Sequence, residues 1–290
     1  MELQDLDELI KQSRPAAKPD FNEDFYYQLL EKAYIKLSDN IEKPPVCIAI
    51  KKDMRIIPVL TLGNFSLIKG QSKSKKTFAI SLILAAAGYD KTIGDKIIPY
   101  NVVNKKIVFC DTEQSPYHVH RFLKSTIAAA GQSHQPENLI TFCLRPYETG
   151  MRLKLIEFII DKTPGLGLLV IDGVRDLVND FNDPAEAKHI ADLLLKWTTE
   201  KNIHIATVLH ENKADGKARG HLGSELQNKA ETVLRIYRDE TTPEVSIIEP
   251  EQTRGEQFDP IAFKLLNEGF ALHPIILPNH TTPKKTRSSF

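Results

Sequence analysis

The sequence predicts an α/β fold in which a mostly parallel sheet is covered by helices on both faces. Short apolar segments alternate with segments of helical spacing from residue 65 to residue 209, as expected of βαβ units. A small basic loop follows the first of these strands and leads directly into an apolar helix. After residue 231 the apolar segments follow one another closely, which predicts C-terminal strands that extend the sheet in antiparallel fashion.

The residues before this core are predicted to form a separate N-terminal segment. Residues 1–20 are polar, and residues 21–37 have helical spacing that ends before Pro44. Two apolar runs, 47–50 and 56–60, flank a charged turn and predict a β-hairpin. We therefore expect an arm with a helix and a hairpin over residues 1–60, a main domain over 61–275 and a disordered tail over 276–290.

Each element of the main domain is identified by its periodicity. Apolar runs of about five residues predict buried strands, and longer segments with apolar residues three and four apart predict helices. Strands and helices are expected to alternate as strand 65–69, helix 76–88, strand 106–110, helix 115–131, strand 138–144, helix 150–162, strand 167–172, helix 184–201, strand 203–209 and helix 222–230. Closely spaced strands are then expected at 232–238, 245–250 and 261–266.

Composition limits the class of protein. Lys plus Arg and Asp plus Glu each total 38 in 290 residues, so any contact with nucleic acid must come from a local patch. The three cysteines have no metal or disulfide spacing, which indicates free thiols in a reducing compartment. The acidic N-terminus does not resemble a signal peptide, and no apolar run is long enough to span a bilayer. We expect a cytoplasmic protein with no membrane partner.

The loop after the first core strand has the layout of a phosphate-binding P-loop. From Gly70 to Lys76-Thr77 the spacing fits G-x-x-x-x-G-K-[ST], except that Lys75 occupies the place of the second Gly. In such loops backbone N–H groups bind phosphate oxygens, the Lys reaches the terminal phosphates and the Thr holds Mg²⁺. A basic loop before an ordinary core helix is the alternative. The residues expected to bind the nucleotide are Gly70, Gln71, Ser72, Lys73, Ser74, Lys75, Lys76, Thr77 and Phe78.

Two carboxylates are expected beside this loop. Asp172 ends a buried strand and is predicted to hold Mg²⁺ together with Thr77, although a turn or capping role is the alternative. Gly173 follows it, where many ATPases carry their water-activating Glu. Glu113 lies just past the end of the strand 106–110, and the carboxyl ends of parallel strands meet at one edge, so Glu113 can orient the attacking water. A first-turn role for Glu113, or Asp111 as the catalytic carboxylate, are the alternatives.

The order of these motifs resembles the RecA-like ATPases, and within them the hexameric DNA helicases of the DnaB and plasmid RepA type. Residues 223–240, which end in Tyr-Arg-Asp-Glu, are similar to the matching DnaB-type stretch. The resemblance covers about residues 60–270. It implies a RecA-like P-loop NTPase core of the AAA ATPase kind, ATP and Mg²⁺ as cofactors, a homo-oligomer in the form of a hexamer, and single-stranded DNA as the partner. No part of residues 1–45 resembles the DnaB N-terminal domain.

The resemblance implies three further roles. His210 corresponds to a polar sensor of the γ-phosphate. The loop that follows it, 211–221, corresponds to a loop that contacts the backbone of single-stranded DNA, through Lys213, Lys217 and Arg219. Arg254 corresponds to an arginine finger that reaches the neighbouring subunit's site, although Gln252 stands where the family carries a second basic residue. From the residues alone, a strand-end His, a solvated loop and a surface Arg are the alternatives.

The sequence therefore predicts an ATPase that couples hydrolysis to movement on single-stranded DNA, as a helicase or translocase. A role in replication or transfer of a plasmid or mobile element is implied by the resemblance alone. One alternative is a recombinase-like or regulatory ATPase that does not unwind DNA. Another is a non-catalytic nucleotide-binding scaffold, which is suggested by Lys75 and Gln252.

Overall fold

The computed structural model describes residues 22–211, 218, 220–268 and 271–278. Contacts between residues divide the chain into two units, Met1–Lys43 and Pro44–Phe290. In the first unit, helix α2 (Glu23–Ala33) begins after Asn22, whose side chain accepts the N–H of Phe25 at 3.2 Å. None of the residues of α2 is buried.

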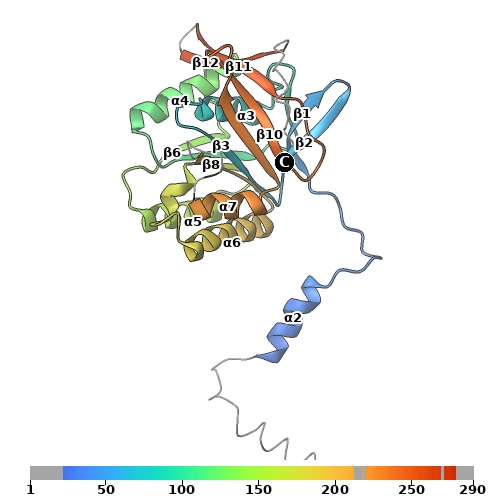
Figure 1. The fold of residues 1–290 in the computed structure, drawn as a ribbon. Coiled ribbons are helices and arrows are strands. Elements are labelled where there is room, and N and C mark those ends of the chain that lie inside the picture. Colours follow the sequence, from blue (N-terminus) through green and yellow to red (C-terminus); the bar gives the residue numbers. More distant parts are fainter. Residues whose placement is uncertain (1–21, 212–217, 219, 269–270, 279–290) are drawn as a thin grey trace, which may run out of the picture. The chain divides into compact units, whose positions relative to one another are not determined.

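The second unit is built on a nine-stranded sheet (Figure 1) with the order β12-β11-β10-β9-β3-β8-β7-β5-β6. Neighbouring strands are parallel from β9 through β3, β8, β7 and β5 to β6, whereas the pairs β9–β10, β10–β11 and β11–β12 are antiparallel. Their bounds are β3 (Phe65–Gly70), β5 (Lys106–Asp111), β6 (Leu139–Cys143), β7 (Leu166–Asp172), β8 (His204–His210), β9 (Thr232–Arg238), β10 (Val245–Thr253), β11 (Ile261–Glu268) and β12 (Ala271–Leu277).

This architecture confirms the α/β fold with a mostly parallel sheet and antiparallel C-terminal strands. One detail differs. We expected every strand after residue 231 to be antiparallel, but β9 pairs with β3 in parallel, so the antiparallel part begins one strand later. The helix α7 (Gly220–Lys229) lies between β8 and β9 and returns the chain to the edge where β8 began, which is what a parallel neighbour requires.

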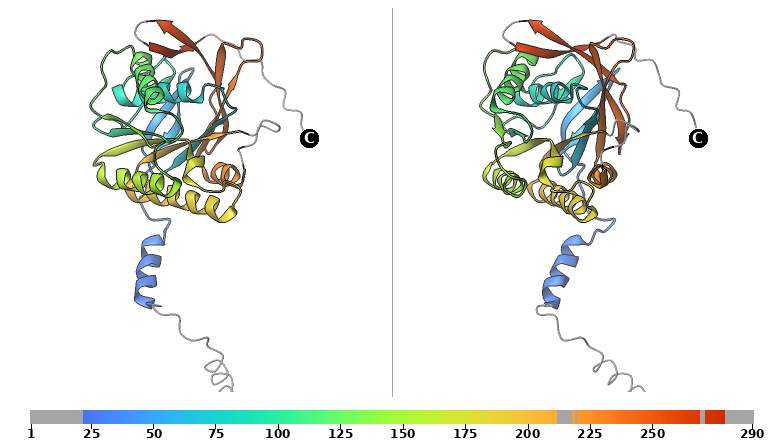
Figure 2. Two further views of the ribbon diagram at one scale, coloured as in Figure 1. Left: turned by 90° about the vertical axis from the view of Figure 1, so that its left-hand side faces the viewer. Right: turned by 60° about the vertical axis from the view of Figure 1, so that its left-hand side comes forward.

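Helices cover both faces of the sheet because successive side chains of its strands point to opposite sides. In β7, Leu168 and Val170 pack into the core cluster that contains residues of α3 (Lys76–Tyr89) and α4 (Pro116–Ala129). Leu169 and Ile171 pack into the cluster on the other face, which contains residues of α5 (Thr149–Lys162), α6 (Pro184–Lys201) and α7. Figure 2 shows these two helical layers on opposite sides of the sheet.

Three elements were not predicted. The hairpin of β1 (Val46–Lys52) and β2 (Arg55–Thr61) gains a third strand, β4 (Ile97–Pro99), which is too short to produce a periodic pattern. The 3₁₀ helix η1 (Val174–Leu177) follows β7. Strand β12 contains Pro274 and runs to Leu277, into the range expected of the tail. Among the residues that the structure describes, no helix is long and apolar enough to cross a bilayer.

Candidate active site

The loop between β3 and α3 adopts the backbone geometry that its unusual sequence requires. A Cβ atom at Gly70 would lie 2.2 Å from the carbonyl oxygen of Ile236, so only glycine fits there. Lys75, in the place of the expected second Gly, has φ 70° and ψ 30° and is the N-cap of α3. These angles lie in the left-handed region that glycine adopts without strain. Lys75 therefore takes up the conformation of the missing glycine, and its Nζ donates to the carbonyl of Glu244 at 2.6 Å.

Lys76 closes this loop with its own ammonium group. Its Nζ lies 2.9 Å from the carbonyl oxygen of Gly70, 3.0 Å from that of Gln71 and 3.0 Å from Nδ1 of His210. Burial lowers the pKa of Lys76, and the nearby carboxylates of Asp172 and Glu113 oppose this shift. A phosphate oxygen placed in the loop can replace the two carbonyls as the acceptor.

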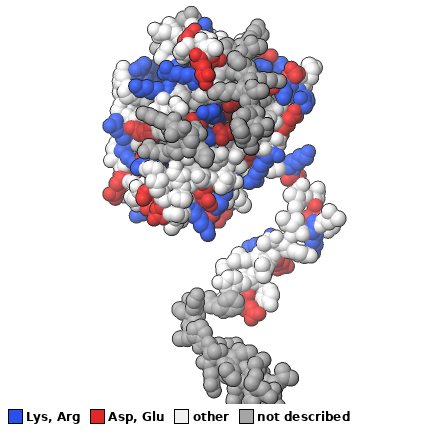
Figure 3. Space-filling view, in the orientation of Figure 1, with Lys and Arg blue, Asp and Glu red and all other residues white. Residues whose placement is uncertain are grey.

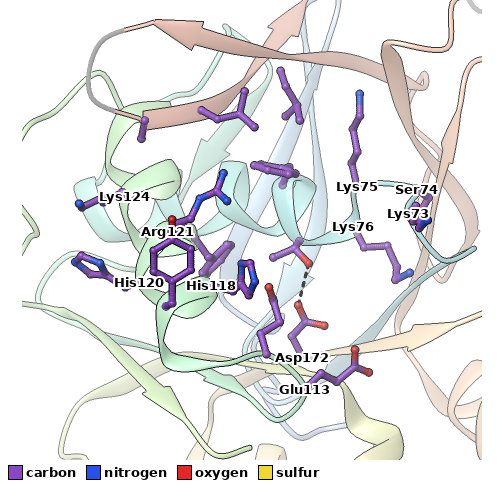
Figure 4. A pocket seen from close by; sticks show the side chains of 18 of the residues that line it. Lys73, Ser74, Lys75, Lys76, Glu113, His118, His120, Arg121, Lys124 and Asp172 are labelled. Atoms are coloured by element: carbon purple, nitrogen blue, oxygen red, sulfur yellow. Dashed lines mark hydrogen bonds between the residues drawn. The ribbon is translucent and has the colours of Figure 1, made fainter.

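Thr77 and Asp172 meet at the base of the loop, and the dashed line that ends on Asp172 in Figure 4 marks the hydrogen bond between them. The hydroxyl of Thr77 donates to Oδ2 of Asp172 at 3.3 Å. Burial, and secondly the neighbouring charges of Asp111 and Glu113, raise the pKa of Asp172 to about 7. A buried carboxylate with excess negative charge around it, next to a hydroxyl, fits the hard oxygen ligands that Mg²⁺ prefers.

Protein ligands alone do not complete such a metal site. Within the described residues, no group of three His, Cys, Asp or Glu side chains is placed to hold a metal ion. Mg²⁺ is commonly held by one or two protein oxygens together with waters and substrate phosphates. The pair Thr77 and Asp172 therefore fits an ion that arrives with a nucleotide.

Asp111 shapes the turn that carries Glu113. Its Oδ1 accepts the backbone N–H groups of Glu113 at 3.0 Å and Gln114 at 2.6 Å, and its Oδ2 accepts the side-chain amide of Gln114 at 2.8 Å. Asp111 is fully buried, and this burial is the main reason that its pKa is raised. With Asp111 engaged in this way, Glu113 is the carboxylate of this turn that lines the pocket.

Glu113 and His210 face each other across the end of the sheet. Oε2 of Glu113 lies 3.6 Å from Nε2 of His210, and this contact is the main reason that the pKa of Glu113 is lowered. A Cβ atom at Gly173 would lie 2.6 Å from Oε1 of Glu113, so the small residue after Asp172 makes room for this carboxylate. His210 thereby connects Lys76 on one ring nitrogen with Glu113 on the other.

A pocket of about 870 Å³ opens above these groups. One wall is the loop with Glu113, Asp172 and His210, and the opposite wall comes from α4 and the β11–β12 hairpin. Figure 3 shows Lys and Arg side chains gathered at the upper left, where Figure 1 places α4. The α4 residues that line the pocket are Tyr117, His118, His120, Arg121, Phe122 and Lys124.

Sequence reasoning missed this α4 wall. His118 and His120 are two positions apart on a helix, where side chains do not share a face, so their spacing gives no reason to place both at one site. The pocket is wide enough for both to line it. A helical pattern was nevertheless present, because Tyr117, Arg121 and Lys124 follow Glu113 at spacings that place them on one stripe of the helix.

The remaining predicted site residues lie elsewhere. Arg254 follows β10, is exposed and is not among the residues that line this pocket. Its backbone N–H donates to the carbonyl of Glu231 at 3.1 Å, and its Nη2 to that of Lys229 at 3.3 Å. The predicted DNA contacts Lys213, Lys217 and Arg219 lie outside the described residues.

The fold and this site define a P-loop ATPase of the RecA-like class. Residues 51–216 match the AAA_25 family, described as an AAA domain, which is more than half of the chain. The chain belongs to this family. The crystal structure of the RadB recombinase is similar over 74% of this chain and 92% of that chain, with a TM-score of 0.50 and 16% sequence identity, a likeness that shows the fold alone. No curated protein matches the sequence.

Proposed function

We propose that the protein is an ATP-driven motor that acts on single-stranded DNA as an oligomeric ring. The resemblance to hexameric helicases implies that this ring is a hexamer. The observation that supports it most directly is the connected set Lys76, His210 and Glu113 beside Thr77 and Asp172. These groups come from the ends of three strands, β5, β7 and β8, and from the first turn of α3, at the carboxyl edge where ligands bind in parallel sheets.

In the proposed reaction each group has a separate task. The loop from Gly70 to Phe78 binds the phosphates of ATP, and Lys76 exchanges its carbonyl partners for phosphate oxygens. Thr77 and Asp172 hold Mg²⁺. When bound, Mg²⁺ would neutralise negative charge on the phosphoryl group that is transferred.

Glu113 orients the water that attacks the terminal phosphate. Its lowered pKa keeps it a carboxylate at neutral pH, so it can accept a hydrogen bond from that water. His210 lies within reach of both Glu113 and Lys76, which suits a sensor of the terminal phosphate. The apolar side chains of Phe78 and Leu272 in the same pocket provide a surface for the nucleobase.

Arg254 is proposed to act on the site of a neighbouring subunit. Its absence from its own pocket is compatible with a finger supplied in trans. The site would then be complete only in an oligomer. Lys213, Lys217 and Arg219 are proposed to contact the DNA backbone, since the chain has no net charge and needs a local basic segment.

The proposal is tested by phosphate release with and without single-stranded DNA. We expect Lys76→Ala to lower turnover by about 10²-fold or more, because it removes a donor aimed at the charge of the transition state. Lys188→Ala, which changes an exposed lysine on α6 that does not line the pocket, is the matched control and keeps turnover within a few fold. Full activity of Lys76→Ala would contradict the assignment of the site.

A mixing experiment tests the oligomer. Lys76→Ala and Arg254→Ala are each expected to be inactive, whereas an equimolar mixture recovers part of the activity. In mixed rings some sites combine an intact Lys76 with an intact Arg254 from the neighbour. A mixture no more active than its components would argue against a finger supplied in trans.

A recombinase-like or regulatory ATPase is the second candidate, and such a protein would share its fold with the structure named RadB recombinase. The two candidates differ in what they do to a duplex. Unwinding of a forked duplex, driven by ATP, supports the helicase. Turnover stimulated by single strands without any unwinding supports the second candidate.

A further inference from the structure

A cluster next to the P-loop contains four charged side chains, those of Lys69, Glu211, Arg235 and Glu251. We refer to it as the ionic cluster. The side chains of Lys69 and Glu211 are 1% and 0% exposed. Nζ of Lys69 lies 2.7 Å from Oε1 of Glu251 and 3.9 Å from Oε1 of Glu211, and Nε of Arg235 donates to the same Oε1 of Glu211 at 2.9 Å. Charges are buried this completely only when they are paired.

The ionic cluster is attached directly to the active site. Lys69 precedes Gly70 on β3, and Glu211 directly follows His210 at the end of β8. The backbone N–H of Glu211 donates to the carbonyl of Gly70 at 3.0 Å, and that carbonyl also accepts from Nζ of Lys76 at 2.9 Å. Glu211 is therefore held to the cluster by its side chain and to the P-loop by its backbone.

Within the described residues, the carboxylate of Glu211 is held through one of its two oxygens. Its Oε2 is buried and has no hydrogen-bond partner within the described part of the chain, so Oε1 carries the attachment to Arg235 and Lys69. Gln227 on α7 supports the other half of the cluster, since its Oε1 accepts from Lys69 at 3.4 Å and its Nε2 donates to Glu251 at 3.3 Å.

We infer that Glu211 is a positioning residue for ATP hydrolysis and that it acts through His210. When Lys76 turns to a phosphate, it must leave the Gly70 carbonyl and Nδ1 of His210. The backbone bond from Glu211 to Gly70 and the ionic cluster then remain to hold the imidazole beside Glu113. This inference rests on the proposed function, because it assumes hydrolysis at this site.

The test is a double-mutant cycle on His210 and Glu211. Glu211→Gln keeps the shape of the side chain and removes its charge. We expect it to lower kcat about tenfold, since small displacements of catalytic groups are costly, and to leave the Kd of a fluorescent non-hydrolysable ATP analogue within about threefold. In a His210→Ala background the same change should lower kcat no further, because its effect passes through the missing imidazole.

Glu225→Gln is the matched control, because within the described residues the only ion pair of Glu225 is with Lys229 on the same helix, and the change should leave both constants unchanged. The inference would be overturned if the effects of Glu211→Gln and His210→Ala on kcat multiplied in the double variant. It would also be overturned if Glu211→Gln had the kcat of the wild type. A parallel loss of kcat and nucleotide binding would also overturn it, as a purely structural role.

Arg235→Lys decides the matter if Glu211→Gln does not fold. It keeps the charge, removes the Nε donor to Glu211, and should show the same non-additivity with His210→Ala. Wild-type protein that releases no phosphate would refute the proposed function itself. An active wild type with unaffected variants would refute only the positioning role.

Discussion

Lys75 provides a direct test of the backbone strain in the P-loop. The residue has φ 70°, although it carries a side chain. We compare Lys75→Gly with Lys75→Ala. Both variants lose the hydrogen bond from Nζ to the Glu244 carbonyl, so their difference in stability reports the backbone at this position. Glycine adopts the left-handed conformation freely, whereas alanine keeps the clash of its Cβ atom.

The expected difference follows from two opposing terms. A non-glycine residue in the left-handed region costs about 1–2 kcal/mol. Glycine loses more conformational freedom on folding, which costs about 0.5–1 kcal/mol relative to alanine. The free energy of unfolding of Lys75→Gly should therefore exceed that of Lys75→Ala by about 0.5–1 kcal/mol. Lys73, with φ 66°, should give a similar difference when treated in the same way.

Urea unfolding of the purified variants at pH 7.5, followed by far-UV circular dichroism, measures this difference. Nucleotide affinity is measured in parallel and should be retained in Lys75→Gly, since glycine restores the usual P-loop pattern. An alanine variant as stable as the glycine variant, or more stable, would show that position 75 is not strained. The physical account of Lys75 as a substitute for glycine would then be wrong.

Three further predictions follow from buried groups. Gly173→Ala should lower ATP turnover about 10²-fold with little change in nucleotide affinity, because the added Cβ would lie 2.6 Å from Oε1 of Glu113; unchanged turnover would contradict this. The pKa of Asp172 is about 7 against an ordinary 3.8, so without metal its ionisation removes stability as the pH rises through 7, by at most about 4 kcal/mol. Asp172→Asn should therefore be more stable than wild type at pH 8 and similar at pH 4, as measured by urea midpoints. Burial lowers the pKa of His204 to about 4 from 6.5. The stability that neutral His204 gives the folded protein is therefore lost as the pH falls from 6.5 through 4, by up to about 3 kcal/mol, which is the opposite pH dependence to that of Asp172. His204→Gln should reduce that acid-side loss, and a variant with the wild-type pH dependence would show that His204 does not titrate in this way.

Much of the core could be predicted from local patterns. Strand β7 is apolar throughout because both of its faces are covered, and a run of this length bounded by turn residues predicts a buried strand. Helix α6 begins after Asp183, whose side chain accepts two backbone N–H groups, and Pro184 occupies its first position. Such signals lie within a few residues of one another, so they are readable without knowledge of the fold.

Features that depend on distant neighbours were missed or misjudged. The direction of β9 is set by its pairing with β3, more than a hundred residues earlier in the chain, and no pattern within β9 encodes it. The α4 wall lines the pocket together with residues of β11 and β12, which lie more than a hundred residues later in the chain. The roles proposed for Arg254 and for Lys213, Lys217 and Arg219 remain predictions.

The sequence by itself determined which chemical groups stand at the strand ends: a Lys-Thr pair after β3, a carboxylate after β5, another at the end of β7 and an imidazole at the end of β8. Only the tertiary structure decided which of them meet. Strand order places β8 between β3 on one side and β7 followed by β5 on the other, and this puts His210 between Lys76 and Glu113. Chemical identity is a property of each residue, whereas distance depends on how the whole sheet packs.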